Sequence, residues 1–161
     1  MAHHFLPDEN GNTKRPDAIN VLGLLTFVNT GLFIVIYGIG LLGMLAVQQM
    51  SLTDFQALFQ EGAFTMMPEE SRAMIDVIVP VLYYHGAALM GIYMMRTVLR
   101  LIGAIGIWRG KKKGFYLYAG AQLIGLFAPH IILPWQFLGF MGPLLTVAVT
   151  ATYGRHIKRM I

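Results

Sequence analysis

Four apolar runs, each long enough to cross a bilayer as a helix, make up most of this chain. They cover residues 19–47, 77–108, 114–133 and 135–154. A membrane helix needs about 20 apolar residues, and only helices and closed barrels satisfy every backbone hydrogen bond in lipid. The runs are too long and too uniformly apolar for the alternating strands of a barrel. The pattern therefore predicts an all-α membrane protein with four transmembrane helices.

The polar stretch between the first two runs contains a further helical pattern. Ser51 followed by Asp54 resembles an N-terminal capping box. Apolar side chains then recur at helical spacing, at Leu52, Phe55, Leu58 and Phe59. We expect a short amphipathic helix that ends at Gly62 and lies on the outer membrane surface or over the bundle. A second helix should start at Pro68 and run into the second span with a bend at Pro80.

The composition supports a membrane protein and narrows its chemistry. The 161 residues are 56% hydrophobic and only 12% charged, whereas soluble domains carry about 25% charged residues. The chain has no cysteine, which excludes disulfides, thiolate metal sites and cysteine nucleophiles. It also has no phosphate-binding loop, no zinc motif and no pair of intramembrane carboxylates. The sequence therefore favours neither an enzyme nor a proton-driven transporter.

The basic residues predict how the chain is oriented. The net charge of +4 arises beside the spans, which indicates membrane orientation rather than a nucleic-acid surface. Three regions that four spans would place on one side carry Lys14, Arg15, Arg109, Lys111, Lys112, Lys113, Arg155, Lys158 and Arg159. We therefore expect both termini in the cytoplasm, with residues 1–18 as a flexible or loosely docked tail. Trp108 and the three lysines after it should anchor the inner interface.

Two arginines lie inside the second apolar run. Arg96 and Arg100 are four residues apart, so both guanidinium groups lie on one face of a helix. Arg96 is about 18 Å of helix from Trp108, and Arg100 is about 12 Å from it. Each arginine costs about 2.5–3.5 kcal/mol at the centre of a membrane helix. Such residues usually face a bundle interior or a cavity and mark a functional site.

The sequence leaves open what these arginines contact. No acidic residue occurs in the four apolar runs, and the neutral acceptors are Asn20, Asn29, Gln122, Thr146, Thr150 and carbonyls near Pro129 and Pro143. One explanation is snorkelling combined with such hydrogen bonds, which suits Arg100 better than the deeper Arg96. A second is an acidic residue of a partner chain, and a third is an anionic ligand such as a lipid phosphate.

Histidines and glycines complete the candidate residues. His85 and His130 could ligate a haem between neighbouring helices, but their depths differ, at about 34 Å and 22 Å of helix from the basic loop. A quinone near His130, Trp135 and the arginines is the other alternative, and we predict no cofactor.

Small residues at close-packing spacings should seat the helices against one another. They include Gly38, Gly40 and Gly43, Ala87 with Gly91, Gly106 with Gly110, and Ala121 with Gly125.

Residues 101–124 carry a pattern of their own. A glycine-containing helix end, a tryptophan, a short basic loop, Gly-Phe and a tyrosine follow one another as Gly103, Trp108, Lys111 to Lys113, Gly114, Phe115 and Tyr118. This segment resembles one in small uncharacterised four-helix membrane proteins of bacteria. The resemblance covers about a seventh of the chain. It implies a bacterial inner membrane and supplies no function or site.

Two functions from different classes fit the sequence. The first is a non-enzymatic membrane subunit, either an accessory or scaffolding component of a larger complex or a homo-oligomer. Its small size and unpaired intramembrane charge favour this hypothesis. The second is a module that binds or transports an anionic lipid or a small anion through Arg96 and Arg100. Both make membrane lipids natural partners of the chain.

Overall fold

The computed structural model describes residues 5–61 and 69–161, and every regular element in these ranges is helical. The α-helices are α1 Asp17–Val47, α2 Leu52–Glu61, α3 Glu69–Trp108, α4 Lys112–Phe127 and α5 Met141–Gly154. Short 3₁₀ helices follow α4 and α5, namely η2 Ala128–Ile131, η3 Trp135–Leu138 and η4 Ile157–Arg159. The predicted all-helical class is confirmed for the described part of the chain.

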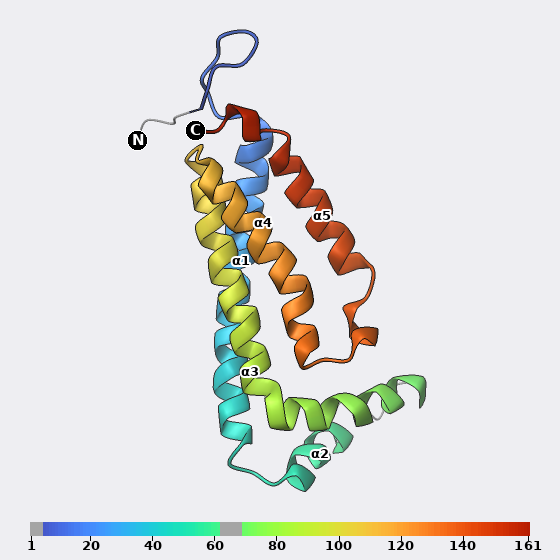
Figure 1. Ribbon diagram of the computed structural model, residues 1–161. Helices are drawn as coiled ribbons and strands as arrows, with labels where there is room; N and C mark the ends of the chain where they lie inside the picture. The colour runs from blue at the N-terminus through green and yellow to red at the C-terminus, as the bar shows by residue number, and fades with distance from the viewer. Residues whose placement is uncertain (1–4, 62–68) are drawn as a thin grey trace.

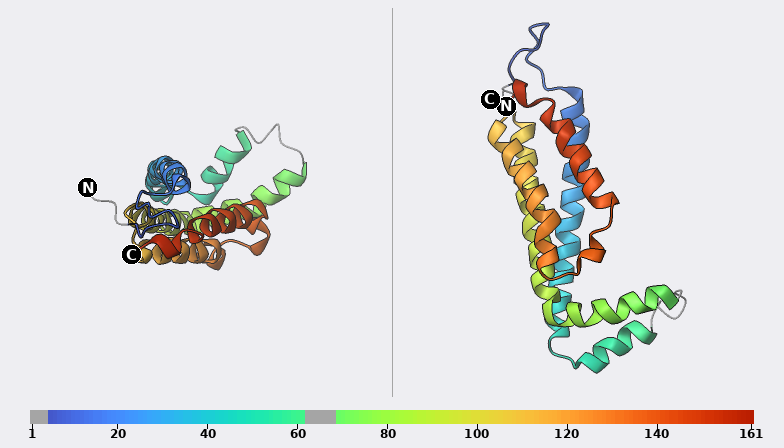
Figure 2. Two further views of the ribbon diagram at one scale, coloured as in Figure 1. Left: turned by 90° about the horizontal axis from the view of Figure 1, so that it is seen from above. Right: turned by 45° about the vertical axis from the view of Figure 1, so that its right-hand side comes forward.

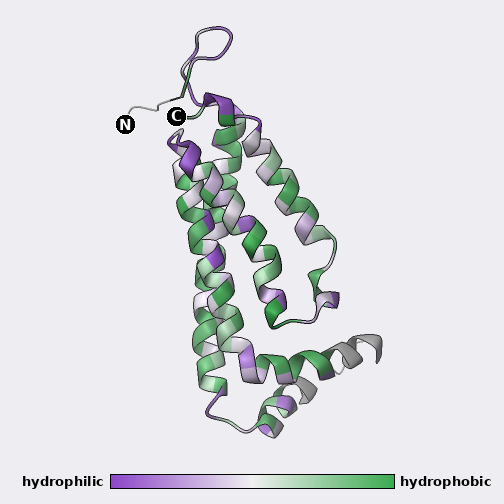
Figure 3. Ribbon diagram, in the orientation of Figure 1, coloured by the Kyte–Doolittle hydropathy of each residue, from purple (hydrophilic) through white to green (hydrophobic). Residues whose placement is uncertain are grey.

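Two of these helices are long and apolar enough to cross a membrane. They are α1, with 31 residues, and the Ile75–Trp108 part of α3, with 34 residues. They run antiparallel and side by side, α4 returns along α3, and α5 packs against α4 (Figures 1 and 2). Hydrophobic residues predominate along α1, α3 and α5 (Figure 3). The central layer of the bundle is thus α3, which packs against both α1 and α4.

Glycines bring α3 and α4 into close contact. A Cβ atom added at Gly106, one of the expected packing glycines, would lie only 2.6 Å from the Cα of Gly114. One added at Gly103 would lie 2.6 Å from the backbone nitrogen of Tyr118. The connection between the helices turns at Gly110, whose φ of 73° suits glycine best. Backbone approaches backbone here, as small residues allow between membrane helices.

The third and fourth predicted spans differ from the observed helices. The segment expected to be helical over residues 114–133 leaves the α-helix after Phe127, and α5 begins at Met141 instead of residue 135. Pro129 and Pro134 lack the N–H that an α-helix needs, and Gly139 has a φ of 61°. These residues break the chain into η2 and η3. The structure therefore does not confirm four transmembrane helices, and within residues 5–61 and 69–161 two helices have the length and composition for a span.

The predicted amphipathic helix is present as α2. Ser51 Oγ accepts a hydrogen bond from the Asp54 N–H at 3.1 Å and donates one to Asp54 Oδ2 at 2.6 Å, which completes the cap. Phe55 is buried, with its ring 5.9 Å from that of Tyr83. Gly62 and Pro68 lie outside the described residues, as does the side chain of Phe59.

The long helix α3 is bent, and its first part projects sideways from the bundle beside α2 (Figures 1 and 2). Pro80 lies inside α3, and a proline inside a helix removes a hydrogen bond and kinks the axis. The bend expected from the sequence is therefore present. It separates the part of α3 that runs along α1 from the part that accompanies α2.

Both ends of the described chain pack together at the end of the bundle opposite α2 (Figure 1). Phe5 and Met160 are buried in a core cluster that also contains Ile19, Ala104, Ile107, Tyr118 and Tyr153. Arg159 donates hydrogen bonds to the Asn12 and Lys14 carbonyls at 2.9 and 3.0 Å. Residues 5–16 of the N-terminal tail are thus docked on the bundle, because buried Phe5 and the hydrogen bonds of Arg159 hold them. Residues 1–4 lie outside the described residues.

Candidate functional site

The two arginines of α3, Arg96 and Arg100, bind neutral side chains on neighbouring helices. Arg96 Nη2 donates a hydrogen bond to Gln122 Oε1 of α4 at 3.1 Å, and Arg100 Nη2 donates one to Asn29 Oδ1 of α1. Both acceptors belong to the set that the sequence offered. The chain contains no acidic residue after Asp76, so α4 and α5 supply no negative side chain to balance these charges.

Each arginine is also incompletely satisfied. The Nε atoms of Arg96 and Arg100 are buried and have no hydrogen-bond partner among the described residues. A guanidinium group carries five N–H donors, and a buried donor without a partner costs about 1–3 kcal/mol. Two cationic groups with spare donors therefore face the interior of the bundle.

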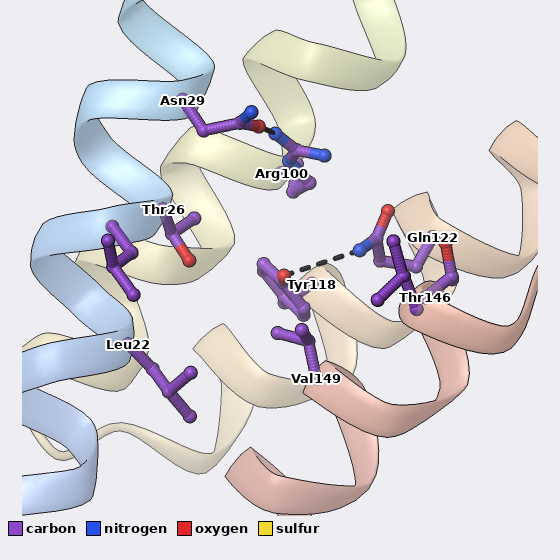
Figure 4. A pocket seen from close by; sticks show the side chains of 10 residues that line it. Leu22, Thr26, Asn29, Arg100, Tyr118, Gln122, Thr146 and Val149 are labelled. Carbon is purple, nitrogen blue, oxygen red and sulfur yellow. Dashed lines mark hydrogen bonds between the residues drawn. The ribbon is translucent and has the colours of Figure 1, made fainter. Parts of the chain in front are cut away.

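A cavity of about 430 Å³ lies beside Arg100. Figure 4 shows its lining side chains projecting from α1, α3, α4 and α5. The polar part of the lining is Thr26, Asn29, Arg100, Tyr118, Gln122 and Thr146, and the apolar part is Leu22, Leu25, Leu145 and Val149. The volume falls within the range of about 300–1,000 Å³ that is typical of ligand pockets. One positive charge, five neutral polar groups and an apolar flank suit an amphiphilic anion.

Hydrogen bonds connect several of the polar groups that line this cavity, and Thr30 and Tyr153 extend the cluster behind them. Gln122 Nε2 donates to Tyr118 Oη at 3.3 Å, and Thr26 Oγ1 lies 3.0 Å from Tyr153 Oη. The Tyr118 and Tyr153 rings meet edge to face, with their centroids 5.2 Å apart. Thr30 donates to the Thr26 carbonyl at 2.7 Å. These contacts fix the orientation of the hydroxyl and amide groups that line the cavity.

The apolar flank of the cavity is open. Leu25 of α1 and Leu145 of α5 line it, and they are 60% and 58% exposed. Asn29, the partner of Arg100, is exposed as well. A ligand could therefore place a polar group on Arg100 while an attached chain leaves between α1 and α5.

The conformation of the Arg96 side chain requires a glycine at position 125 of α4. A Cβ atom at Gly125 would overlap the Cγ, Cδ and Nε atoms of Arg96. The Arg96 side chain thus lies directly over Gly125 and reaches Gln122 one turn earlier on the same helix. Gly125 was expected to seat one helix on another, and its hydrogen atom instead leaves room for a cationic side chain.

The structure separates the two histidines. His130 lies in η2 and stacks on Trp135, with ring centroids 5.1 Å apart and an interplanar angle of 15°. It lines a cavity together with Arg96. His85 is exposed on α3 and lines neither that cavity nor the one beside Arg100. The residues brought together are therefore Arg96, His130 and, through stacking, Trp135.

The predicted interfacial anchors lie at the end of the bundle where both chain ends pack. Arg15 covers the ring of Trp108 at 3.9 Å from its centroid and donates from Nε to the Trp108 carbonyl at 3.0 Å. Burial lowers the pKa of Arg15. Lys111 and Lys113 are exposed beside this pair. The tryptophan is thus fixed in place by a cation, and the lysines extend into the surroundings.

Comparisons of the chain with protein-family models, with curated proteins and with solved structures found no match. Thr26 and Tyr118, which line the cavity, and Tyr153, which is hydrogen-bonded to Thr26, were not predicted from the sequence as parts of the site. A signal for some of them was present, because Thr26 with Thr30 and Tyr118 with Gln122 are polar pairs four residues apart within apolar runs. This is the same spacing that drew attention to the arginines.

Proposed function

We propose that this chain is an integral membrane protein with four spans that binds the anionic headgroup of an amphiphile in the Arg100 cavity. The observation that carries the proposal is a cationic cavity of about 430 Å³ with an exposed apolar flank and no acidic residue after Asp76 to neutralise it. The headgroup would accept hydrogen bonds from Arg100 and the neighbouring amides. The acyl chain would pass between Leu25 and Leu145.

The surface of α1 supports a location in lipid. Large apolar side chains cover much of it, including Leu32 at 57%, Ile39 at 68% and Leu42 at 69% exposure. A soluble monomer rarely exposes so large an apolar surface. In a bilayer the same side chains face hydrocarbon at no cost. The basic residues at the opposite end from α2 favour the orientation with both chain ends in the cytoplasm.

The test is lipid selection by the purified full chain. The protein is reconstituted into nanodiscs of mixed phosphatidylcholine and phosphatidylglycerol, then extracted in mild detergent and examined by native mass spectrometry. We expect retained phosphatidylglycerol in the unmodified protein and loss of it in Arg100→Gln. A hydrogen bond to a charged group contributes about 1.5–3 kcal/mol. Its loss in Arg100→Gln should therefore weaken the affinity for phosphatidylglycerol roughly ten- to hundredfold.

Arg155→Gln is the matched control, because Arg155 is an exposed arginine that does not line the cavity. This variant should retain phosphatidylglycerol. Equal retention by the unmodified protein and by Arg100→Gln would refute the headgroup site. Stoichiometric co-purification of an acidic membrane protein, lost in the same variant, would instead support the subunit hypothesis.

A further inference from the structure

A second, smaller cavity lies deeper along α3 than the Arg100 cavity. Its volume is about 140 Å³, and Arg96, His130 and Thr146 line it. A water molecule occupies about 30 Å³ in the liquid, so this cavity has room for about five. It is too small for the pockets of about 300 Å³ and more that hold organic ligands. Only a small ion or a few solvent molecules would fit.

Two buried nitrogen atoms without partners belong to residues that line this cavity. They are Arg96 Nε and His130 Nδ1, and neither has a hydrogen-bond partner among the described residues. Arg96 is held over Gly125 by its bond to Gln122, and His130 is held by its stack on Trp135. Both side chains are therefore fixed while each keeps an unused nitrogen.

The backbone around the cavity supports a ligand site. Pro129, Phe137 and Leu138 of η2 and η3 contribute to its lining. Non-helical backbone at membrane depth is tolerated only where it is buried in protein or lines a polar cavity. The break between α4 and α5 thus lies beside the cavity that Arg96 and His130 both line.

We propose that this cavity binds a small oxyanion, an inorganic anion of the phosphate class or a carboxylate ion, with Arg96 Nε and His130 Nδ1 as donors. The anion supplies the negative charge that the chain lacks after Asp76. This site is distinct from the headgroup site of the proposed function, and either can exist without the other. The two cavities share Thr146 in their linings, and Gln122 lines the larger cavity while it accepts the hydrogen bond from Arg96.

The experiment measures binding of radiolabelled inorganic phosphate to the full chain by equilibrium dialysis. The protein is placed in nanodiscs of phosphatidylcholine alone, so that no anionic lipid competes. His130→Phe removes the donor nitrogen and keeps a ring that can stack on Trp135. Gly125→Ala displaces Arg96 without changing any charge, and Gly120→Ala on the same helix is its control, because a Cβ there would meet nothing within 4 Å.

We expect at least a tenfold loss of phosphate binding in His130→Phe and Gly125→Ala, with binding kept in Gly120→Ala and Arg100→Gln. The phosphatidylglycerol assay on the same variants should show the reverse, with loss in Arg100→Gln and retention in His130→Phe. The proposal is overturned if the unmodified protein binds no phosphate, or if only Arg100→Gln abolishes binding. If Gly125→Ala does not fold, as judged by its helicity, His130→Phe decides the result.

Discussion

Replacing Gly103 by alanine tests how closely α3 and α4 must approach. A Cβ atom at this position would lie 2.6 Å from the backbone nitrogen of Tyr118 and 2.8 Å from its Cα. Backbone atoms cannot rotate away as a side chain can, so the helices must separate. Overpacking costs about 1–3 kcal/mol, and alanine recovers about 0.5–1 kcal/mol over glycine in a helix. The difference between these two ranges is a net loss of up to about 2.5 kcal/mol in the free energy of unfolding.

Gly91→Ala on the same helix is the control for intrinsic helix propensity. A Cβ at Gly91 would meet nothing within 4 Å, so this variant should be unchanged or more stable by up to about 1 kcal/mol. Unfolding by sodium dodecyl sulfate in mixed micelles, followed by far-ultraviolet circular dichroism, compares the two. The near-ultraviolet signal of Tyr118 and Tyr153 should weaken in Gly103→Ala alone. Equal unfolding midpoints for both variants would refute close backbone contact between the helices.

Three further outcomes follow from other parts of the molecule. Arg96→Leu should insert at least as well as the unmodified chain, because it removes an insertion cost of about 2.5–3.5 kcal/mol; a reduced yield in the membrane fraction would contradict this. Burial and two nearby arginines lower the pKa of His156 from 6.5, so stability should fall as the pH drops through that value toward the folded-state pKa. His156→Gln should lack this fall in unfolding assays. Cysteines placed at Lys112 and Thr53 should be labelled from opposite sides of the membrane, and labelling from one side would refute the four-span topology.

The sequence was informative wherever a local pattern decides the structure. The uninterrupted apolar run predicted α1, and the Ser51 cap predicted α2. Asn29 and Gln122 could be named as acceptors for the arginines because the apolar runs offer few polar side chains. The break after Phe127 was harder to predict, since Pro129 lies in the run 114–133, whose hydropathy alone suits one continuous helix.

Other features depend on three-dimensional placement and have no local signature. Nothing in the sequence around Gly125 shows that an arginine crosses it, because the contact joins residues 29 positions apart on two helices. Docking of the N-terminal segment likewise requires Arg159, from the far end of the chain. Both cavities are bounded by side chains from at least three segments. The spacing of residues in the sequence could identify the two arginines as candidates, but it could not predict the cavities beside them.

The stability of an Arg100 variant, measured with and without anionic lipid, tests whether this arginine binds a ligand or is only tolerated as a buried charge. Arg100 receives one amide acceptor and leaves its buried Nε without a partner among the described residues. A buried charge carries a desolvation penalty that an ion pair can offset, and Arg100 forms no ion pair with the described residues. Without anionic lipid, Arg100→Gln should therefore unfold at the same detergent concentration as the unmodified protein or at a higher one. A ligand that binds only the folded state stabilises it by RT ln(1 + [L]/Kd), so adding phosphatidylglycerol should stabilise the unmodified protein alone. Equal stabilisation of both would mean that Arg100 does not contact the lipid.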